Sequence, residues 1–383
     1  MIIISLALIL LCCLIIWRAC DGYEAASEYL GRNMSEGVRG ATINAIGSSV
    51  PELFTTLCFL FILFDKDGFA GGIGTTAGSA VFNGMIIPAV VILVVVLGGV
   101  VSGVKVSRKV LLRDGIALLL CELALILLIG GDKLTWVHGL ILMSLYGIYV
   151  TYMLTSMKAA PAGDEEDEDE DEDDERSEGS TLMNLVTLNL EPVFVKGDIN
   201  GRSAWALLLS ALVVIGVACF FLVKACEWLG EGLSLPIYFI AVIIASAATS
   251  VPDTILSMKD AKAGNYDDAV ANALGSNIFD VCFALGLPLF LFTLFYGGIQ
   301  MSPETVANVA ELRILLFVLT LVAFFIYIIP KALGMKSAFL LLALYVAFTA
   351  YIIGRAYGWE WTTGIGESLR GIDKSLDILR PWK

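Results

Sequence analysis

The chain of 383 residues is 58% hydrophobic and only 16% charged, with a mean hydropathy of +0.83. This composition excludes an ordinary soluble protein and predicts a chain that lives in a bilayer. The formal charge of −14 comes mostly from residues 164–175, twelve consecutive carboxylates, without which 26 acidic residues face 24 basic ones. The sequence has no basic stripe and no cluster of zinc ligands, and His138 is its only histidine, so nucleic-acid binding is disfavoured.

Ten apolar runs are long enough to cross a membrane, which takes about 20 residues. In chain order they lie near residues 2–17, 38–64, 72–99, 111–130, 135–157, 203–228, 234–258, 266–296, 312–330 and 337–357. The first run lacks the cationic start of a cleaved signal, so we expect it to be retained as the first helix. The sequence thus predicts an all-α integral membrane protein of ten transmembrane helices.

The ten runs form two groups of five, which divide the chain into two halves, a linker and a tail. We expect a first five-helix half over 1–157, a cytoplasmic acidic loop over 158–202, a second half over 203–357 and a tail over 358–383. The loop cannot bury enough apolar surface to fold, so we expect it to be disordered. The eight cysteines are unevenly spaced in or beside apolar runs, and we expect them to be reduced and buried.

Basic residues in the connections indicate the orientation, because cytoplasmic loops hold the excess of lysine and arginine. With the N-terminus outside, the cytoplasmic connections hold fifteen such residues and the opposite connections three. This predicts a multi-pass protein of a plasma or bacterial inner membrane. The tail disagrees with the count, since it places five more basic residues outside. Its apolar residues repeat every three or four positions, which predicts a short helix lying in the membrane interface.

Two short blocks recur in the two halves in the same order. Gly47-Ser48-Ser49-Val50-Pro51-Glu52 matches Ala248-Thr249-Ser250-Val251-Pro252-Asp253, and Gly78-Ser79-Ala80-Val81-Phe82-Asn83 matches Gly275-Ser276-Asn277-Ile278-Phe279-Asp280. An odd number of spans in each half makes the second half enter the membrane from the opposite side. The pattern therefore predicts two inverted five-helix repeats, a plan typical of secondary transporters.

The first pair of blocks places a carboxylate directly after a proline inside an apolar helix. Proline removes a backbone donor and breaks the helix, which leaves carbonyl oxygens free to face inward. A charge in the bilayer centre costs roughly 2.5–3.5 kcal/mol and needs compensation. Glu52 and Asp253, brought together with neighbouring hydroxyls, would form an all-oxygen cage of charge −2, which suits calcium. Zinc, copper and iron are disfavoured because no soft ligand is nearby.

A packing role is the alternative for several of these residues. Gly74, Gly78 and Gly275 fit the close helix packing of membrane proteins. Ser79, Ser276 and Asn83 could each bond a neighbouring helix. Glu52 and Asp253 fit this alternative poorly, since an unpaired carboxylate packs badly in hydrocarbon.

The blocks resemble the alpha-repeats of the calcium/cation antiporter superfamily. The stretch from Ser35-Glu36 through Gly40-Ala41-Thr42, with the first block and Leu53-Phe54 after it, is most similar to the potassium-dependent sodium/calcium exchangers and their bacterial relatives. Asp253 and the second block ending in Asp280 point to the same branch. The resemblance covers nearly the whole membrane part and is most specific at the two repeats.

The resemblance implies a set of ion-binding residues. Glu52 and Asp253 would be the central calcium ligands, with oxygens from Ser48 and Thr249. Flanking sodium sites would be lined by Ser49, Ser250, Ser79 and Ser276. Asn83 and Asp280 would face each other across the middle, and potassium could accompany calcium. No cofactor, enzymatic activity or obligate protein partner is expected beyond the transported ions and membrane lipids.

Three departures from the family pattern affect the site. Ser246-Ala247-Ala248 replaces the usual Ala-x-Gly, so we expect a tighter helix break there, and Thr75 stands where an asparagine is usual, opposite Asn272. Glu122 lies in the middle of the fourth expected span, either protonated and buried or reaching toward the interface.

The residues and the resemblance together predict an antiporter in which calcium and sodium compete for one site by alternating access. A proton/calcium antiporter is the nearest alternative, although its usual Gly-Asn-x-x-Glu signature is missing. An intramembrane aspartyl protease and a non-transporting calcium sensor built on the acidic loop are alternatives from other classes.

Overall fold

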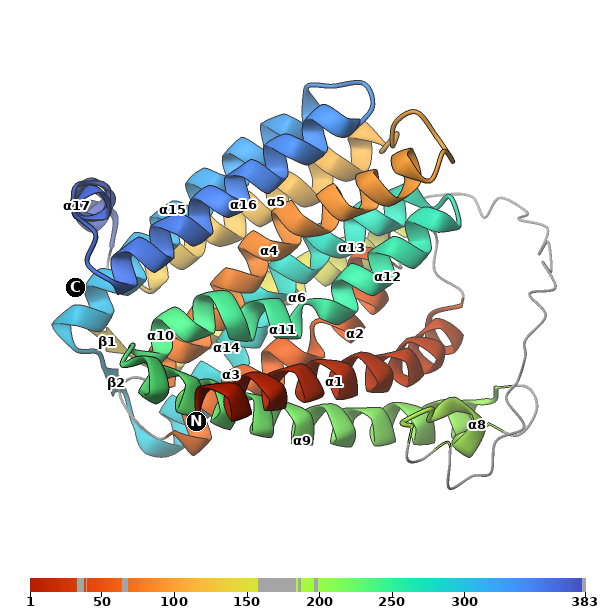
Figure 1. Ribbon diagram of the computed structural model, residues 1–383, viewed down its shortest axis with the longest axis horizontal. Coiled ribbons are helices and arrows are strands. Elements are labelled where there is room, and N and C mark those ends of the chain that lie inside the picture. The colour runs from red at the N-terminus through yellow and green to blue at the C-terminus, as the bar shows by residue number, and fades with distance from the viewer. Residues whose placement is uncertain are drawn as a thin grey trace.

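The computed structural model describes residues 1–32, 38, 40–63, 68–157, 184, 187–195 and 199–380, and it is almost entirely helical (Figure 1). The all-α prediction is confirmed at this level. The acidic run 164–175 and the dipeptide Ser35-Glu36 lie outside the described residues. Two strands of two residues each, β1 (Lys133–Leu134) and β2 (Ile299–Gln300), pair antiparallel and join two connections at one end of the bundle.

The described α-helices differ widely in length, because several spans are broken into short pieces. In chain order they are α1 (Ile2–Gly31), α2 (Ala45–Ser48), α3 (Val50–Ile62), α4 (Gly68–Leu97), α5 (Arg108–Leu128), α6 (Trp136–Met157), α8 (Glu191–Phe194), α9 (Gly201–Leu233), α10 (Ile237–Ile240), α11 (Ser246–Thr249), α12 (Val251–Lys262), α13 (Tyr266–Phe279), α14 (Leu285–Tyr296), α15 (Pro303–Ile328), α16 (Met335–Ala356) and α17 (Glu360–Ser375). Three π-helical turns, η1 (Gly40–Asn44), η2 (Ala241–Ala245) and η3 (Asp280–Ala284), and one 3-10 turn, η4 (Leu376–Leu379), complete the helical elements.

Eight helical runs among the described residues are long and apolar enough to cross a membrane. A ninth results if Gly40–Ser48 and Val50–Ile62, which are bent by 44° at their junction, count as one span. The remaining expected span is α5, which does not qualify because Arg113, Asp114 and Glu122 add charge to its apolar stretch. The multi-pass prediction is confirmed, while the count of ten stays a prediction.

Several spans are longer than the apolar runs suggested. The first helix extends to Gly31 instead of ending near residue 17, and α9 and α15 also extend beyond the predicted limits. These extensions carry polar residues on one face, which helical packing accepts but a search for apolar runs does not detect.

The apolar side chains form two separate clusters. The larger one fills the space between α4, α5, α6, α13, α14, α15 and α16. The smaller one joins α1 to α9, with members such as Ile16 on α1 and Leu207 and Leu222 on α9, and reaches α3 and the run α10–α11. Figure 1 shows α1 and α9 lying side by side along one edge of the bundle. The molecule therefore consists of a helix pair packed against a larger core.

Each π-turn in the first part of a half packs against a glycine of the other half. A methyl group at Gly78 of α4 would lie 2.2 Å from the backbone oxygen of Val242 in η2. A methyl group at Gly275 of α13 would lie 2.7 Å from the backbone oxygen of Ala41 in η1. Backbone thus meets backbone at both contacts, and the expectation of small-residue helix packing holds for these glycines.

The C-terminal helix α17 is fixed to the core by buried ion pairs. Arg313 of α15 is 1% exposed, and its Nη2 lies 2.8 Å from Asp373 Oδ1. Arg380 also pairs with Asp373 and donates to the backbone oxygen of Ile126 at the end of α5. The tail prediction of a helix is correct, and whether that helix lies in the membrane interface stays a prediction.

We predict that Gly78→Ala and Gly275→Ala each destabilise the fold. The added methyl group would overlap backbone, so the helices must separate, and overpacking of this kind costs about 1–3 kcal/mol. The thermal unfolding temperature of the detergent-purified protein measures this effect. Gly84→Ala on α4 is the control, because its new methyl group would meet only Asn277 Nδ2 at 3.4 Å, and it should be neutral or slightly stabilising.

Candidate functional site

In each block with a Pro-acid pair, the helix breaks two residues before the proline. Ser49, with φ −95° and ψ 5°, separates α2 from α3, and Ser250, with φ −82° and ψ 4°, separates α11 from α12. Pro51 and Pro252 then lie in the first turn of the following helix, where the missing N–H does no harm. The second break is less bent than the 44° of the first, since Ile237–Lys262 counts as one span. The tighter break expected there is not observed.

Glu52 lies in the first turn of α3 and is fully buried. Its Oε1 accepts a hydrogen bond of 2.8 Å from Ser79 of α4 and a longer one of 3.4 Å from Ser250. The two serine hydroxyls are themselves 2.5 Å apart. A carboxylate of the first half is therefore held by one serine from each half.

Asp253 occupies the matching position in α12 and is also fully buried. Its Oδ1 accepts hydrogen bonds of 2.5 Å from Ser48 of α2 and from Ser276 of α13. Ser276 matches Ser79, so each carboxylate binds the serine of the glycine-rich helix in its own half. Thr249, which matches Ser48, donates to the backbone oxygen of Ser246 at 3.1 Å and lies beside Glu52. Four serines that the sequence analysis assigned to the site thus form hydrogen bonds with the two carboxylates.

One oxygen of each carboxylate has no hydrogen-bond partner among the described residues. These are Glu52 Oε2 and Asp253 Oδ2, both on side chains that are 0% exposed. Ser49 Oγ and both side-chain atoms of Asn83 are likewise buried without a partner. Buried polar atoms are nearly always paired, so a group of unpaired oxygens indicates a place prepared for something else. Oxygens alone, with negative charge, suit a hard cation.

Asn83 and Asp280 belong to the same cluster, and both are fully buried. Asp280 lies beside Ser79 and Ser49, yet neither of its oxygens makes a hydrogen bond. It begins the π-turn η3, whereas Asn83 lies inside the uninterrupted helix α4. The matched positions thus differ in backbone geometry as well as in charge. Among the described residues, no three side chains of His, Cys, Asp or Glu converge on one point, so neutral oxygens must supply most of the ligands.

Asn272 is a residue of this cluster to which the sequence analysis gave no role. Its Oδ1 accepts from Ser48 Oγ at 3.3 Å, and its Nδ2 donates to Ser257 Oγ at 3.1 Å. Its position four residues before Ser276 places the two on one face of α13, a signal that could have found it. The counterpart Thr75 donates instead to Gly71 of its own helix.

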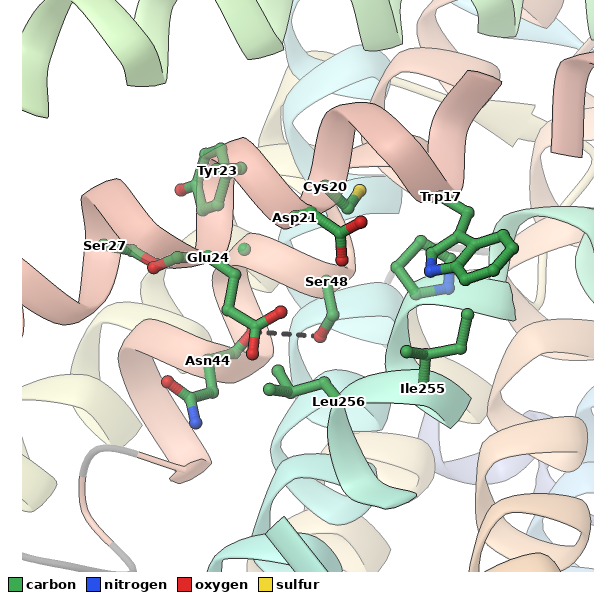
Figure 2. A pocket seen from close by; sticks show the side chains of 12 residues that line it. Trp17, Cys20, Asp21, Tyr23, Glu24, Ser27, Asn44, Ser48, Ile255 and Leu256 are labelled. Atoms are coloured by element: carbon green, nitrogen blue, oxygen red, sulfur yellow. Dashed lines mark hydrogen bonds between the residues drawn. The ribbon is translucent and has the colours of Figure 1, made fainter. Parts of the chain in front are cut away.

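A narrow pocket leads to the cluster from the side of α1 (Figure 2). It lies between α1, α2 and α12 and has a volume of about 20 Å³, room for one or two water molecules. Figure 2 shows the carboxylates of Asp21 and Glu24 on α1 pointing toward Ser48. Since Ser48 binds Asp253, the pocket reaches the carboxylate cluster.

Other residues noted in the sequence lie outside the cluster. Glu122 is fully buried and accepts a 2.7 Å hydrogen bond from Thr320 of α15, so it is a buried acid and does not reach the interface. All eight cysteines are free, and Cys13 and Cys58 are only partly buried. His138 bonds Thr135 at the start of α6.

Comparison with protein families identifies the chain. The family described as "Sodium/calcium exchanger protein" matches residues 4–155 and 203–354, most of both halves. The chain belongs to this family. Exchangers are transporters, so membership confirms that the protein is not an enzyme.

Curated relatives differ in how much of them the chain covers. Human sodium/potassium/calcium exchanger 3 is 39% identical over 123 residues, which are 32% of this chain and only 17% of that protein. Human sodium/potassium/calcium exchanger 5 is 27% identical over 73% of this chain and 68% of its own length. An uncharacterised membrane protein of Methanocaldococcus jannaschii is 24% identical over 90% of this chain and 97% of its own.

Two solved structures share the fold. The sodium-calcium exchanger NCX_Mj, soaked with sodium and calcium, matches with a TM-score of 0.57 and 21% identity over 91% of this chain and 99% of its own. The H+/Ca2+ exchanger CAX matches with a TM-score of 0.63 and 14% identity over 98% of this chain and 92% of its own. At these identities the likeness concerns the fold alone.

We predict that Ser276→Ala destabilises the protein in buffer without calcium. The substitution removes one of two donors to the buried Asp253 Oδ1, and an unsatisfied buried group costs about 1–3 kcal/mol. Thermal unfolding in detergent measures the loss. Thr254→Val is the control, because the Thr254 hydroxyl bonds only the backbone oxygen of Ser250 in its own helix; equal losses in the two variants would contradict the assignment of Ser276 as a support of Asp253.

Proposed function

We propose that the protein is a secondary active antiporter that exchanges sodium for calcium across a membrane. The observation that carries this proposal is the pair of buried carboxylates, one from each half, that each keep one oxygen without a partner. Family membership supports cation exchange, and the hydroxyl-rich surroundings favour sodium as the counter-ion. Calcium accepts six to eight oxygens in irregular geometry, which fits a cluster made mostly of neutral ligands.

In this proposal Glu52 and Asp253 hold calcium through their unpaired oxygens, Glu52 Oε2 and Asp253 Oδ2. Ser48 and Thr249 contribute further oxygens. Flanking sodium sites use four hydroxyls, Ser49, Ser250, Ser79 and Ser276. Asn83 and Asp280 lie beside the site. A divalent ion or monovalent ions can neutralise the same two charges, so the ions compete, and this competition couples the sodium gradient to calcium movement.

We further propose ten spans in two inverted repeats, with α5 as the tenth. Both termini lie at one end of the bundle in Figure 1, which supports an even number of crossings. The mutual packing of η1 with α13 and of η2 with α4 supports the inverted relation. Alternating access then consists of α1 and α9 sliding along the core, since this pair has an apolar cluster of its own.

The proposed orientation places the N-terminus outside and the acidic loop in the cytoplasm. Two of the basic residues that disagreed with the loop count form ion pairs with an acidic residue of α15. Arg355 and Arg370 both pair with Glu311, at 2.8 and 3.0 Å. Arg355 thereby fixes α16 to α15 and Arg370 fixes α17 to α15, so these charges carry less weight in the orientation count.

Proton-driven calcium exchange is the second candidate, because the H+/Ca2+ exchanger CAX has the same fold. The two candidates differ in the gradient that drives calcium. Calcium flux into proteoliposomes under an imposed sodium gradient, compared with an imposed proton gradient, tests them directly. Flux with the sodium gradient alone supports our proposal, and flux with the proton gradient alone refutes it.

We predict that Glu52→Gln and Asp253→Asn each abolish sodium-driven calcium flux. Loss of one partner in a buried charge cluster costs roughly 3–5 kcal/mol, so calcium affinity should fall more than about 100-fold. Flux and calcium binding by the purified protein are the measurements. The control is Glu122→Gln, which changes another fully buried glutamate in the membrane and should keep its flux. Normal flux in a well-folded Glu52 or Asp253 variant would refute their assignment.

We propose in addition that transport requires potassium. An ionised Asp280 brings the charge of the cluster to −3, and calcium alone leaves one anion without compensation in a low dielectric. A proton on Asp280 is one remedy, and a potassium ion bound together with calcium is the other. The similarity to proteins named sodium/potassium/calcium exchangers favours potassium.

Replacing potassium by an impermeant cation should therefore stop calcium flux in the wild type. In Asp280→Asn, which matches the residue type at position 83, the flux should no longer depend on potassium. The measurement is calcium flux into proteoliposomes with and without potassium on both sides. Wild-type flux that is indifferent to potassium would refute this proposal and indicate a protonated Asp280.

A further inference from the structure

The pocket beside α1 is too small for a cation that keeps its hydration shell. Its 20 Å³ holds a water molecule or two, whereas a hydrated cation carries a whole shell of waters. One wall is formed by Trp17, Cys20, Asp21 and Glu24 of α1, and the facing wall by Pro252, Ile255 and Leu256 of α12. Widening the pocket requires α1 and α12 to separate.

Lys259 links these two walls. Its Nζ lies 3.0 Å from Glu24 Oε2 and 3.3 Å from Asp21 Oδ1, so one ammonium group of α12 holds two carboxylates of α1. Arg18 also lies 3.6 Å from Asp21. Both residues are on α1, so this ion pair does not connect the two walls of the pocket. The link spans more than 230 residues of sequence and joins the α1–α9 pair to the core.

We propose that the bridge from Lys259 to Asp21 and Glu24 is the gate that closes this pocket. The proposal rests on the proposed transport function, in which α1 moves along the core. With the bridge formed, α1 stays against α12 and the path to Ser48 and Asp253 is shut. With the bridge broken, the walls separate and the path to Ser48 and Asp253 opens. Lys259, Asp21 and Glu24 are thus positioning residues and do not bind the ion in the central cluster.

The bridge is partly exposed, which sets the size of its effect. The side chains of Lys259, Asp21 and Glu24 are 51%, 35% and 20% exposed. Ion pairs of this kind change an equilibrium only about two- to fivefold, and salt screens them. A weak bridge suits a gate, because a gate must open in every cycle.

Cys20 offers a native reporter, because it lines the pocket and is only 7% exposed. The test measures the rate at which N-ethylmaleimide modifies Cys20 in the full-length detergent-purified protein, read by mass spectrometry. The reagent is neutral, so a changed charge in the pocket does not alter its local concentration. Cys226, 0% exposed between α1 and α9, is read in the same sample and reports loosening of the fold.

Lys259→Met should raise the rate at Cys20 about two- to fivefold and leave the rate at Cys226 unchanged. Lys262→Met, which removes an exposed lysine from the same last turn of α12, should change neither rate. Raising ionic strength with choline chloride should speed Cys20 modification in the wild type and not in Lys259→Met.

A charge exchange separates gating from mere structural support. Lys259→Glu combined with Asp21→Lys and Glu24→Lys restores the bridge with reversed signs, and it should return the Cys20 rate to the wild-type value. The proposal is overturned if Lys259→Met leaves Cys20 unchanged, if Cys20 and Cys226 become reactive together, or if the exchange fails to restore protection. None of these readouts depends on calcium flux, so the gate can fail while the transport proposal stands, and the reverse.

Discussion

The structure depends on the burial of carboxylates in the middle of an apolar bundle. A charge in the hydrocarbon region costs several kcal/mol, and Glu52, Asp253 and Asp280 are all fully buried. Serines satisfy one oxygen of Glu52 and one of Asp253, which holds these side chains in place without using up their charge. The remaining oxygens have no hydrogen-bond partner among the described residues, and in the proposed function a transported cation compensates their charge.

The helix geometry around the carboxylates follows from this requirement. The breaks at Ser49 and Ser250 direct the polar first turns of α3 and α12 toward the centre of the bundle. Helices that carry such turns must come close to each other, and Gly78 and Gly275 let backbone touch backbone at two crossing points. The π-turns at η1 and η2 fill the other side of these contacts. Breaks, glycines and π-turns therefore act together to bring the polar groups within bonding distance.

Much of this arrangement could be predicted from the sequence, because the matched blocks place the same chemistry in both halves. The repeated Pro-acid pairs located both helix breaks, and the repeated Gly-Ser pairs located the serines that meet the carboxylates. The partners of Ser48 and Ser250 could not be predicted, since pairing between halves depends on how two distant helices rotate about their axes. The roles of Asn272 and Lys259 could not be predicted for a related reason: neither stands in a matched block, and contacts such as Ser48–Asn272 and Lys259–Glu24 join segments far apart in the chain. Helix ends were also misjudged where α1 and α9 continue as amphipathic helices beyond the apolar run.

The two halves differ at η3, where Asp280 begins a π-turn while α4 continues through Asn83 without interruption. If the halves were identical, exchanging their conformations would turn the inward-open molecule into an outward-open one of the same energy. An extra carboxylate and a distorted turn in one half remove that equality. In the proposed transport cycle, the two open states would then differ in free energy, and an ion would meet a different barrier when it enters from each face of the membrane. Unequal halves would thus allow the two directions of exchange to run at different rates under equal and opposite gradients.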